Sequence, residues 1–245
     1  MNLQNKVAIV TGGGVRVGRA IALRLAEAGC NLLLHYNRSA MSAIETQKEA
    51  EAFGVEVTLF SADLSQPDTP AQVVEAAYQQ FGRVDILINS AAVYPSNDTF
   101  ATTDAALFDW LMAINLRAPF LLSQAFANAM PDDQQGKIIN ITDARVSRMQ
   151  PDHFVYRFTK LSLSAMTKMM PQVVCPNITV NGIALGAILP PPEADDGYFE
   201  RVVQPRIPIN RTGNPQVVTD TVLFLLQQDF VNGDIITLDG GEFLG

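Results

Sequence analysis

The segment from Val7 to Gly18 reads VAIVTGGGVRVG and constrains the fold more than any other part of the chain. Val7 to Val10 form an apolar run that predicts a buried strand, and Gly12 to Gly14 predict a tight turn after it. Gly18 then allows the following helix to lie close to the sheet. Because backbone N–H groups at such a helix start bind phosphate, the segment predicts a pyrophosphate site for a nucleotide cofactor. A purely structural turn is the alternative, since glycine-rich turns follow many strands.

Length and composition favour one large α/β core. The chain has 245 residues, of which 48% are hydrophobic and 17% charged, so we expect a single domain over residues 1–245. A formal net charge of −8 disfavours nucleic acid or an anionic membrane as partner. Two cysteines, Cys30 and Cys175, are too few for a disulfide framework. With neither a signal peptide nor a bilayer-spanning segment at the N-terminus, the expected location is the cytoplasm.

Short β-branched runs alternate with longer amphipathic stretches along the chain. This alternation predicts a mostly parallel, doubly wound sheet with helices on both faces. Pro171 is expected to end or kink the helix before it. A proline cluster at Pro190 to Pro192 predicts a loop, which we interpret as a lid over a site. The expected strands are residues 7–10, 32–36, 55–60, 86–89, 138–142, 178–183 and 235–238.

The second predicted strand indicates which dinucleotide is bound. An NAD-binding fold places an acidic residue about 20 residues beyond the glycines, where it binds the ribose 2′-hydroxyl. Here the strand ends in His35-Tyr36-Asn37-Arg38-Ser39, without an acid, and Arg16 lies inside the glycine turn. Two guanidinium groups and a hydroxyl suit a 2′-phosphate, which favours NADPH. The alternative is that Arg16 and Arg38 are solvated surface charges.

Tyr156 and Lys160 are four residues apart, so on a helix both side chains lie on one face. Tyrosine has an ordinary pKa near 10 and is a poor acid or base at neutral pH unless a cation stabilises its phenolate. Lys160 is suited to that role, and an oxidised nicotinamide would add further positive charge. Asn89 and Asp143 follow predicted strands, and Asn115 interrupts an otherwise apolar helical stretch.

These motifs together resemble the short-chain dehydrogenase/reductases over essentially the whole chain. The matching elements are TGGGVRVG at 11–18, NSAA at 89–92, Asn115, YRFTK at 156–160 and the DGG at 239–241. The resemblance implies a seven-stranded Rossmann sheet, a homotetramer and a substrate loop at about 186–212. It also implies a proton relay through Asn115, Tyr156 and Lys160. By position, the cofactor-binding residues would be Thr11, Gly12, Gly14, Arg16, Val17, Gly18, Asn37, Arg38, Ser39, Asp63, Leu64, Asn89, Ala91, Tyr156, Lys160, Gly186 and Ile188.

Two departures from the usual family pattern narrow the resemblance. Arg16 replaces the second glycine of the cofactor turn, and Asp143 replaces the serine 13 residues before Tyr156. Together with the segment after the second strand, they look like the pteridine reductase and dihydromonapterin reductase branch. That branch implies NADPH-dependent reduction of dihydropterins or dihydrofolates. It also implies that Arg16, Asn37, Arg38 and Ser39 surround the 2′-phosphate.

Asp143 suits reduction of a C=N bond, which needs a hydride at carbon and a proton at nitrogen. Burial beside a nicotinamide can raise the pKa of a carboxyl group, so Asp143 and Tyr156 are candidates to relay that proton. The expected substrate contacts are Asp143, Tyr156 and Tyr94, whose ring would stack on a flat heteroaromatic substrate. Tyr94 packing its own loop is the alternative.

Two other functions stay open at this point. An ionised carboxylate cannot donate to a ketone oxygen, so one alternative is that Asp143 marks lost carbonyl chemistry and a non-catalytic NADP(H)-binding sensor. The other alternative is an NADPH-dependent carbonyl or 3-oxoacyl thioester reductase. No metal site is expected, because His35 and His153 lack partners at metal-ligand spacing.

Overall fold

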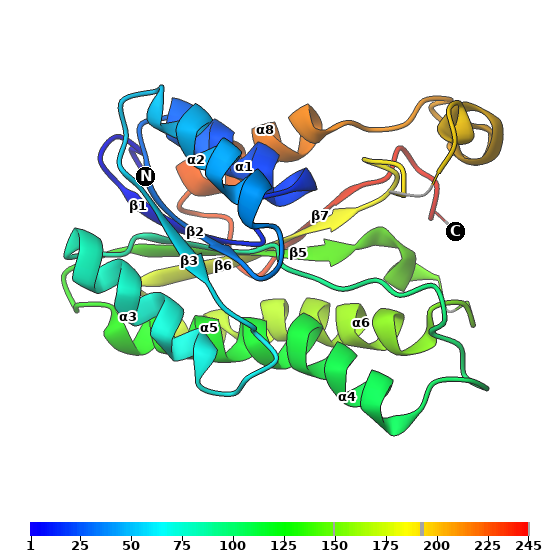
Figure 1. Ribbon diagram of the computed structural model, residues 1–245, viewed down its shortest axis with the longest axis horizontal. Coiled ribbons are helices and arrows are strands. Elements are labelled where there is room, and N and C mark those ends of the chain that lie inside the picture. The colour runs from blue at the N-terminus through cyan, green and yellow to red at the C-terminus, as the bar shows by residue number, and fades with distance from the viewer. Residues whose placement is uncertain (149, 192–193, 245) are drawn as a thin grey trace.

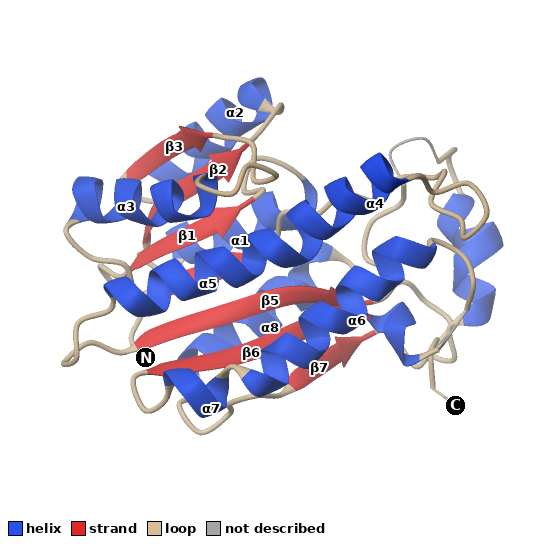
Figure 2. Cartoon of the chain, turned by 90° about the horizontal axis from the view of Figure 1, so that it is seen from below, coloured by secondary structure: helices blue, strands red, loops and turns tan. Residues whose placement is uncertain are grey.

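The computed structural model describes residues 1–148, 150–191 and 194–244 and contains one seven-stranded sheet of order β3-β2-β1-β4-β5-β6-β7. All six neighbouring pairs are parallel, and Figure 2 shows the strand arrows side by side, pointing toward the same end of the molecule. This confirms the predicted α/β architecture. The strands are β1 (Val7–Thr11), β2 (Asn31–Tyr36), β3 (Val57–Ser61), β4 (Ile86–Asn89), β5 (Gly136–Asp143), β6 (Ile178–Leu185) and β7 (Ile235–Leu238).

Helices cover both faces of the sheet (Figure 1). One face carries α1 (Arg16–Glu27), α2 (Ala40–Glu51) and α8 (Pro215–Gln227). The other carries α3 (Thr69–Phe81), α4 (Ala105–Met112), α5 (Ala118–Ala129), α6 (Phe154–Met169) and α7 (Pro171–Val174). The expected break at Pro171 is confirmed, because α6 ends at Met169 and α7 starts at the proline. Shorter turns span Ala113–Arg117, Ala144–Ser147, Phe199–Val203 and Gln204–Arg206.

The strand sequences explain this three-layer arrangement. Side chains alternate between the two faces of a strand. In β1, Ala8 and Val10 pack in the core on the α1/α8 side, whereas Ile9 packs in the core on the α3/α5 side. Leu32 and Leu33 in β2 divide in the same way. Because both faces are apolar, each strand needs helices above and below it, as in other parallel sheets.

The continuous helical run from Ala105 to Ala129 is the one segment among the described residues that is long and apolar enough to cross a membrane. It includes α4, a π-helical turn (Ala113–Arg117) and α5. Core helices of soluble proteins meet the same two criteria. Leu122 and Phe126 are fully buried, and α5 packs on α3 and β4. This packing accounts for the apolar character of the buried side of α5.

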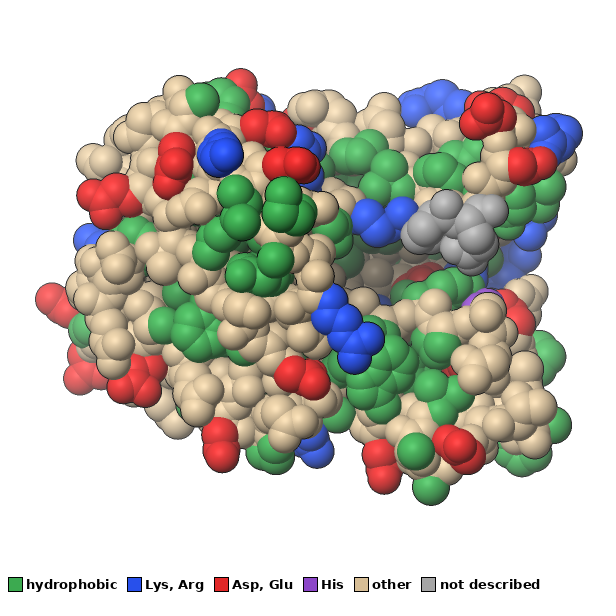
Figure 3. Space-filling view, viewed as in Figure 1, with side chains coloured by type: hydrophobic (Ala, Val, Ile, Leu, Met, Phe, Trp, Pro, Cys, Tyr) green, Lys and Arg blue, Asp and Glu red, His purple; other side chains and the backbone are tan. Residues whose placement is uncertain are grey.

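The order of the strands places a crevice where ligands bind in such sheets. Sequence order reverses between β1 and β4, so the connections after these strands run to opposite faces. The molecule is hollowed at the end toward which the strands point, between the layer of α1 and α8 and the layer of α4 and α6 (Figure 3). The glycine turn, Asp143 and the residues after β2 and β3 lie at this edge.

Candidate active site

The glycine turn after β1 is shaped by close backbone packing. Gly12 has a φ of +65°, a conformation that side chains disfavour. A Cβ atom on Gly18 would lie 2.2 Å from the carbonyl oxygen of Gly12, and one on Gly14 would lie 3.0 Å from Cβ of Ala43. The turn therefore has room for backbone only, against both α1 and α2.

The start of α1 fits a phosphate group. Its N-cap residue, Val15, supplies no side-chain hydrogen bond to the first turn of the helix. The N–H groups at Arg16, Val17 and Gly18 are thus left for a ligand or solvent. Such donors, reinforced by the helix dipole, are what a pyrophosphate needs. The residues present therefore fit a dinucleotide at this turn.

Thr11 and His35 hold the turn in place from inside the fold. The Thr11 hydroxyl donates to the Ile88 carbonyl and accepts from the N–H groups of Ser90 and Ala91, which joins β1 to the chain after β4. The N–H of Gly12 donates to Nδ1 of His35 at 3.3 Å, and Nε2 of His35 lies 3.1 Å from the carbonyl oxygen of Ala62. Because Nδ1 accepts, the proton of neutral His35 is on Nε2.

His35 is expected to make stability depend on pH below neutrality. Burial lowers its pKa below the ordinary 6.5. Below about pH 6.5 the unfolded chain binds a proton that the folded chain does not, so stability falls as the pH decreases. Urea midpoints between pH 5 and 8 should therefore fall more steeply for the wild type than for His35→Asn. Parallel curves for the two proteins would contradict this assignment.

The residues expected near the adenosine half of the cofactor lie at the ends of β2 and β3. Asn37 and Arg38 are exposed in the turn before α2, and Ser39 is half-buried. Asp63 and Leu64 follow β3, where an Asp63 carboxylate oxygen accepts the N–H of Ser65 at 2.9 Å. All five belong to the same edge of the sheet as the glycine turn.

Arg16 contacts a different part of the molecule from the one expected. Its guanidinium donates to the Pro190 carbonyl oxygen at 2.9 Å, so it reaches the loop after β6. Arg16 opens α1 with a φ of +53°, a backbone conformation that is uncommon for residues other than glycine. In this structure Arg16 thus joins the cofactor turn to the proposed lid.

Tyr156, Asp143 and Lys160 lie together at the carboxyl end of β5. The Tyr156 hydroxyl donates to Oδ2 of Asp143 at 2.9 Å. Oδ1 of Asp143 accepts the N–H of Arg145 at 2.8 Å. Lys160 Nζ donates to the Ile141 carbonyl at 2.8 Å and is 5.9 Å from the centre of the Tyr156 ring. The structure therefore brings together three of the four predicted catalytic residues through β5 and α6.

The electrostatics of this group differ from the expectation that Lys160 lowers the pKa of Tyr156. Burial raises the pKa of Tyr156 well above 10, and the neighbouring Asp143 raises it further. Burial also lowers the pKa of Lys160 to about 8, although Asp143 opposes this shift. In the protein without a bound cofactor, the Tyr156 hydroxyl therefore keeps its proton at neutral pH. It is buried, and its hydrogen-bond partner is a carboxylate rather than the ammonium group.

Asn115, the fourth predicted catalytic residue, holds the chain after β4. It is buried in the π-helical turn between α4 and α5. Its amide oxygen accepts the N–H of Val93 at 2.9 Å, and its amide nitrogen donates to the Val93 carbonyl at 3.0 Å. These two hydrogen bonds hold the backbone of Val93, the residue that precedes Tyr94. The extra residue of a π turn, common at functional sites, supports this placement.

Tyr94 lies beside Tyr156 at the mouth of the site and is 46% exposed. Its ring stacks on His153 at 4.1 Å between centroids and meets the Tyr156 ring edge-on at 4.7 Å. The Tyr94 hydroxyl accepts a hydrogen bond from the Arg145 guanidinium. An exposed aromatic ring thus lies next to the hydrogen-bonded Tyr156 and Asp143 side chains.

Asp98 is a site residue that the sequence analysis missed. This buried side chain comes from the loop after β4 and accepts the N–H groups of Val155 and Tyr156 at 3.0 and 2.6 Å. It therefore caps α6, whose own N-cap residue, His153, gives no side-chain hydrogen bond. Asp98 and Tyr156 are 58 residues apart in sequence, so no local capping pattern marks the contact.

Asp98→Ala is expected to lower stability by about 2 kcal/mol, because it leaves buried N–H groups without an acceptor. It should also lower kcat, since it loosens the first turn of the helix that carries Tyr156. Asp104→Ala is the matched control, because Asp104 caps α4 through the N–H of Leu107. Urea unfolding and kcat should be measured for both variants. A kcat loss as large in Asp104→Ala would rule out a specific role for Asp98.

The side chain of Asn89 makes its hydrogen bonds in the interior of the protein. Its amide nitrogen donates to the amide oxygen of Asn140 at 2.8 Å and lies 3.3 Å from the Ser123 hydroxyl. Asn140 in turn donates to the Thr167 hydroxyl. The Asn89 side chain is thus directed between the sheet and α5 and α6, and its expected contact with the cofactor stays a prediction.

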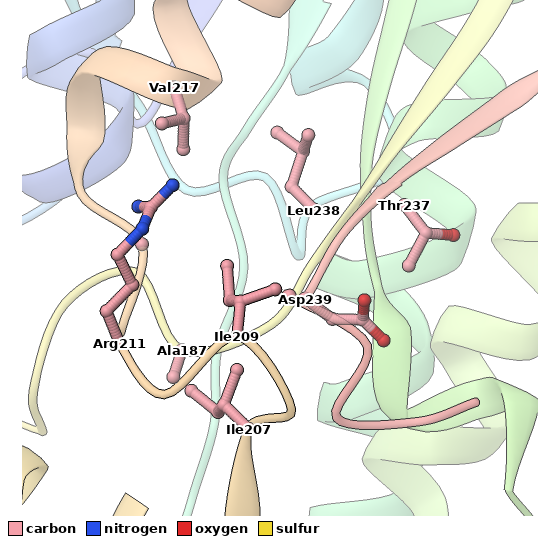
Figure 4. A pocket seen from close by; sticks show the side chains of 10 residues that line it. Ala187, Ile207, Ile209, Arg211, Val217, Thr237, Leu238 and Asp239 are labelled. Carbon is pink, nitrogen blue, oxygen red and sulfur yellow. The ribbon is translucent and has the colours of Figure 1, made fainter. Parts of the chain in front are cut away.

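Gly186 and Ile188 begin the loop after β6. The N–H of Gly186 donates to the Leu238 carbonyl at 3.0 Å, and Ile188 is buried. Beyond them a cavity of about 190 Å³ lies between this loop, α8 and the end of β7 (Figure 4). Asp143, Tyr156 and Lys160 do not line it. Its lining residues are Ala187, Ile207, Ile209, Arg211, Gly213, Val217, Thr237, Leu238, Asp239 and Gly240.

Comparison with known proteins identifies the family. A family profile described as enoyl-(acyl carrier protein) reductase matches residues 14–242. A short-chain type dehydrogenase/reductase from Picea abies is 30% identical over 98% of this chain and 93% of its own. The chain is a short-chain dehydrogenase/reductase. As a member of this family, it is an NAD(P)-dependent oxidoreductase that acts on a small molecule.

Two solved short-chain dehydrogenase/reductases illustrate the range of its relatives. The FolM alternative dihydrofolate reductase 1 from Brucella canis, complexed with NADP, is 31% identical with a TM-score of 0.92, covering 100% of this chain and 97% of its own. The acetoin dehydrogenase YohF from Salmonella typhimurium is 32% identical with a TM-score of 0.89, covering 99% and 97%. The comparisons therefore identify the family. They do not identify the substrate, because the two relatives are named for different substrates.

Proposed function

We propose that this short-chain dehydrogenase/reductase uses NADPH to reduce a C=N bond of a reduced pterin or folate. The observation that carries the proposal is the hydrogen bond from the Tyr156 hydroxyl to Asp143. It places the Tyr156 proton, and a carboxyl group that can replace it, beside the exposed Tyr94 ring. The likeness to the Brucella alternative dihydrofolate reductase supports the same substrate class.

The chain's own residues would supply the proton and position the substrate. When bound, the reduced cofactor supplies a hydride, which carries both electrons of the reduction to the C=N carbon. Tyr156 would give its hydroxyl proton to the nitrogen, since burial keeps that proton in place at neutral pH. Asp143, which is half-buried, would return a proton from solvent to the Tyr156 oxygen. The C=N double bond becomes a C–N single bond with one new hydrogen on each atom.

The proposed preference for NADPH rests on the edge beyond β2. Arg38 is exposed in the turn after this strand, which carries no acidic residue at positions 37–39. A 2′-phosphate would find a guanidinium and the Ser39 hydroxyl there. Gly12, Gly14, Val17 and Gly18 would hold the pyrophosphate through the start of α1. Residues 186–212 would then form the substrate loop of one domain.

The test is NADPH oxidation with dihydrobiopterin, dihydromonapterin and dihydrofolate, next to diacetyl and a 3-oxoacyl thioester. Wild type and Asp143→Ser are assayed together. Turnover of a pterin or folate that falls at least about 100-fold in Asp143→Ser would support the proposal. Turnover of carbonyl substrates alone would overturn it.

Carbonyl reduction is the second candidate, because the acetoin dehydrogenase is as similar to this chain as the alternative dihydrofolate reductase. In that case Asp143→Ser should retain or gain carbonyl activity, since a hydroxyl can donate to a carbonyl oxygen. The non-catalytic sensor receives no support from the family assignment, which makes the chain an enzyme.

We also propose that the enzyme is a homo-oligomer, with a tetramer as the expected form. Large apolar side chains are exposed on the helices of one layer, including Trp110 on α4, Phe120 on α5 and Phe158 on α6. Exposed aromatic groups of this kind are typical of subunit interfaces. Light scattering after size exclusion should show a mass above that of one chain, and Phe120→Glu should reduce it. A monomeric wild type would contradict this proposal.

A further inference from the structure

Arg145 is a half-buried cation in the candidate active site that the proposed mechanism does not use. Its guanidinium donates to the Tyr94 hydroxyl and lies 5.6 Å from the centre of the Tyr94 ring. Within residues 1–148, 150–191 and 194–244, it forms no ion pair with a carboxylate. A guanidinium has five N–H donors, so most of its donors are left for a ligand.

Hydrogen bonds to both the N–H and the carbonyl of Arg145 hold its backbone in place, and this positions the start of its side chain. Its N–H donates to Oδ1 of Asp143 at 2.8 Å, and its carbonyl accepts from the buried Arg157 guanidinium at 2.7 Å. Arg157 is anchored in turn by an ion pair with Asp152 at 2.7 Å. The turn Ala144–Ser147 therefore presents Arg145 from a rigid position at the mouth of the site.

We propose that Arg145 determines specificity by binding a carboxylate of the substrate. Together with the proposed function, on which this inference rests, it predicts preference for folate-type substrates, which carry a glutamate tail, over pterins with uncharged side chains. Arginine binds carboxylates through two parallel hydrogen bonds.

The arrangement around Tyr94 supports this choice of ligand. His153 stacks on the Tyr94 ring and the Tyr156 ring meets it at 83°, yet Tyr94 is still 46% exposed and offers a flat substrate an open aromatic surface. A substituent leaving that substrate past the hydroxyl end of Tyr94 would meet Arg145. Asp143 forms no hydrogen bond with the guanidinium; its oxygens accept from Tyr156 and from the Arg145 backbone. A free cation in a chain of net charge −8 is thus available to an anionic tail.

Equilibrium binding to the enzyme saturated with NADP⁺ tests the inference without turnover. Dihydrofolate and dihydrobiopterin are titrated against wild type, Arg145→Met and Arg148→Met, with protein fluorescence as the readout. Arg148 is the matched control, because it lies on the same segment but its guanidinium donates to the Leu244 carbonyl. Melting temperatures show whether each variant is folded.

Arg145→Met is expected to raise the Kd for dihydrofolate about 10- to 100-fold, the effect of losing a hydrogen bond to a charged group. The Kd for dihydrobiopterin should change less than about twofold, and Arg148→Met should change neither. Equal losses for both ligands, or none, would overturn the inference. Arg145→Lys keeps the charge and should recover only part of the affinity. If wild type binds both ligands but oxidises NADPH with neither, the proposed function fails while the specificity result stands.

Discussion

Tyr156→Phe is expected to lower kcat by about 100- to 10,000-fold, the range for loss of a general acid. The variant keeps the ring and its edge-on contact with Tyr94 but loses the hydroxyl bonded to Asp143. No other described residue donates a side-chain hydrogen bond to that carboxylate, so its proton route to the substrate is interrupted. The measurement is kcat with whichever substrate the wild type reduces, together with the Kd for NADPH.

The Kd for NADPH should stay within about twofold, because the lost group acts in the transition state rather than in ground-state binding. Tyr78→Phe is the control, since Tyr78 packs among the α3 and α5 side chains. A Tyr156→Phe variant with near wild-type kcat would remove Tyr156 from the mechanism. In that case Asp143 would have to supply the proton to the substrate.

Gly18→Ala is expected to have the largest effect on folding, about 3 kcal/mol or more of lost stability. The added methyl carbon would lie 2.2 Å from the Gly12 carbonyl oxygen and 2.8 Å from its carbon. Both atoms are backbone, so α1 or the glycine turn must move. The same movement displaces the N–H groups proposed to bind pyrophosphate, so NADPH affinity should fall as well.

Urea unfolding and NADPH titration separate these two effects when Gly82→Ala is the control. Gly82 ends α3 with a φ of +71° and has open space around it. Its substitution should cost about 1 to 2 kcal/mol through backbone conformation alone and leave NADPH binding unchanged. If Gly18→Ala bound NADPH like the wild type, the packing of α1 on the turn would have no role in cofactor binding.

The sheet could be predicted from the sequence because its signals are local. Apolar runs mark each strand, and the expected 86–89 and 235–238 agree with β4 and β7 at both ends. Other bounds differ by one or two residues: β5 starts at Gly136 rather than at residue 138, whereas β3 starts at Val57 rather than at residue 55. The spacing of Tyr156 and Lys160 is also local, and α6 carries both. These features need no knowledge of distant parts of the chain.

The features that the sequence did not predict are contacts between segments far apart in sequence. Asp98 caps α6 from another loop, and Asn89 pairs with Asn140 on the neighbouring strand. The raised pKa of Tyr156 depends on which partner its hydroxyl faces, which the spacing of four residues does not determine. The Arg16 guanidinium donates to the carbonyl oxygen of Pro190, which lies 174 residues away in sequence. In each case the direction of a side chain depends on tertiary packing.

The two anchors of the loop after β4 have a consequence for how substrate range can change during evolution. Asn115 forms two hydrogen bonds with the backbone of Val93, and Asp98 accepts hydrogen bonds from the start of α6. Residues 94–97 lie between these anchors, and neither anchor depends on their side chains. Mutations there can alter what stacks in the mouth of the site while Tyr156 stays where it is. New substrate preferences can therefore arise in a four-residue window without a loss of catalytic geometry.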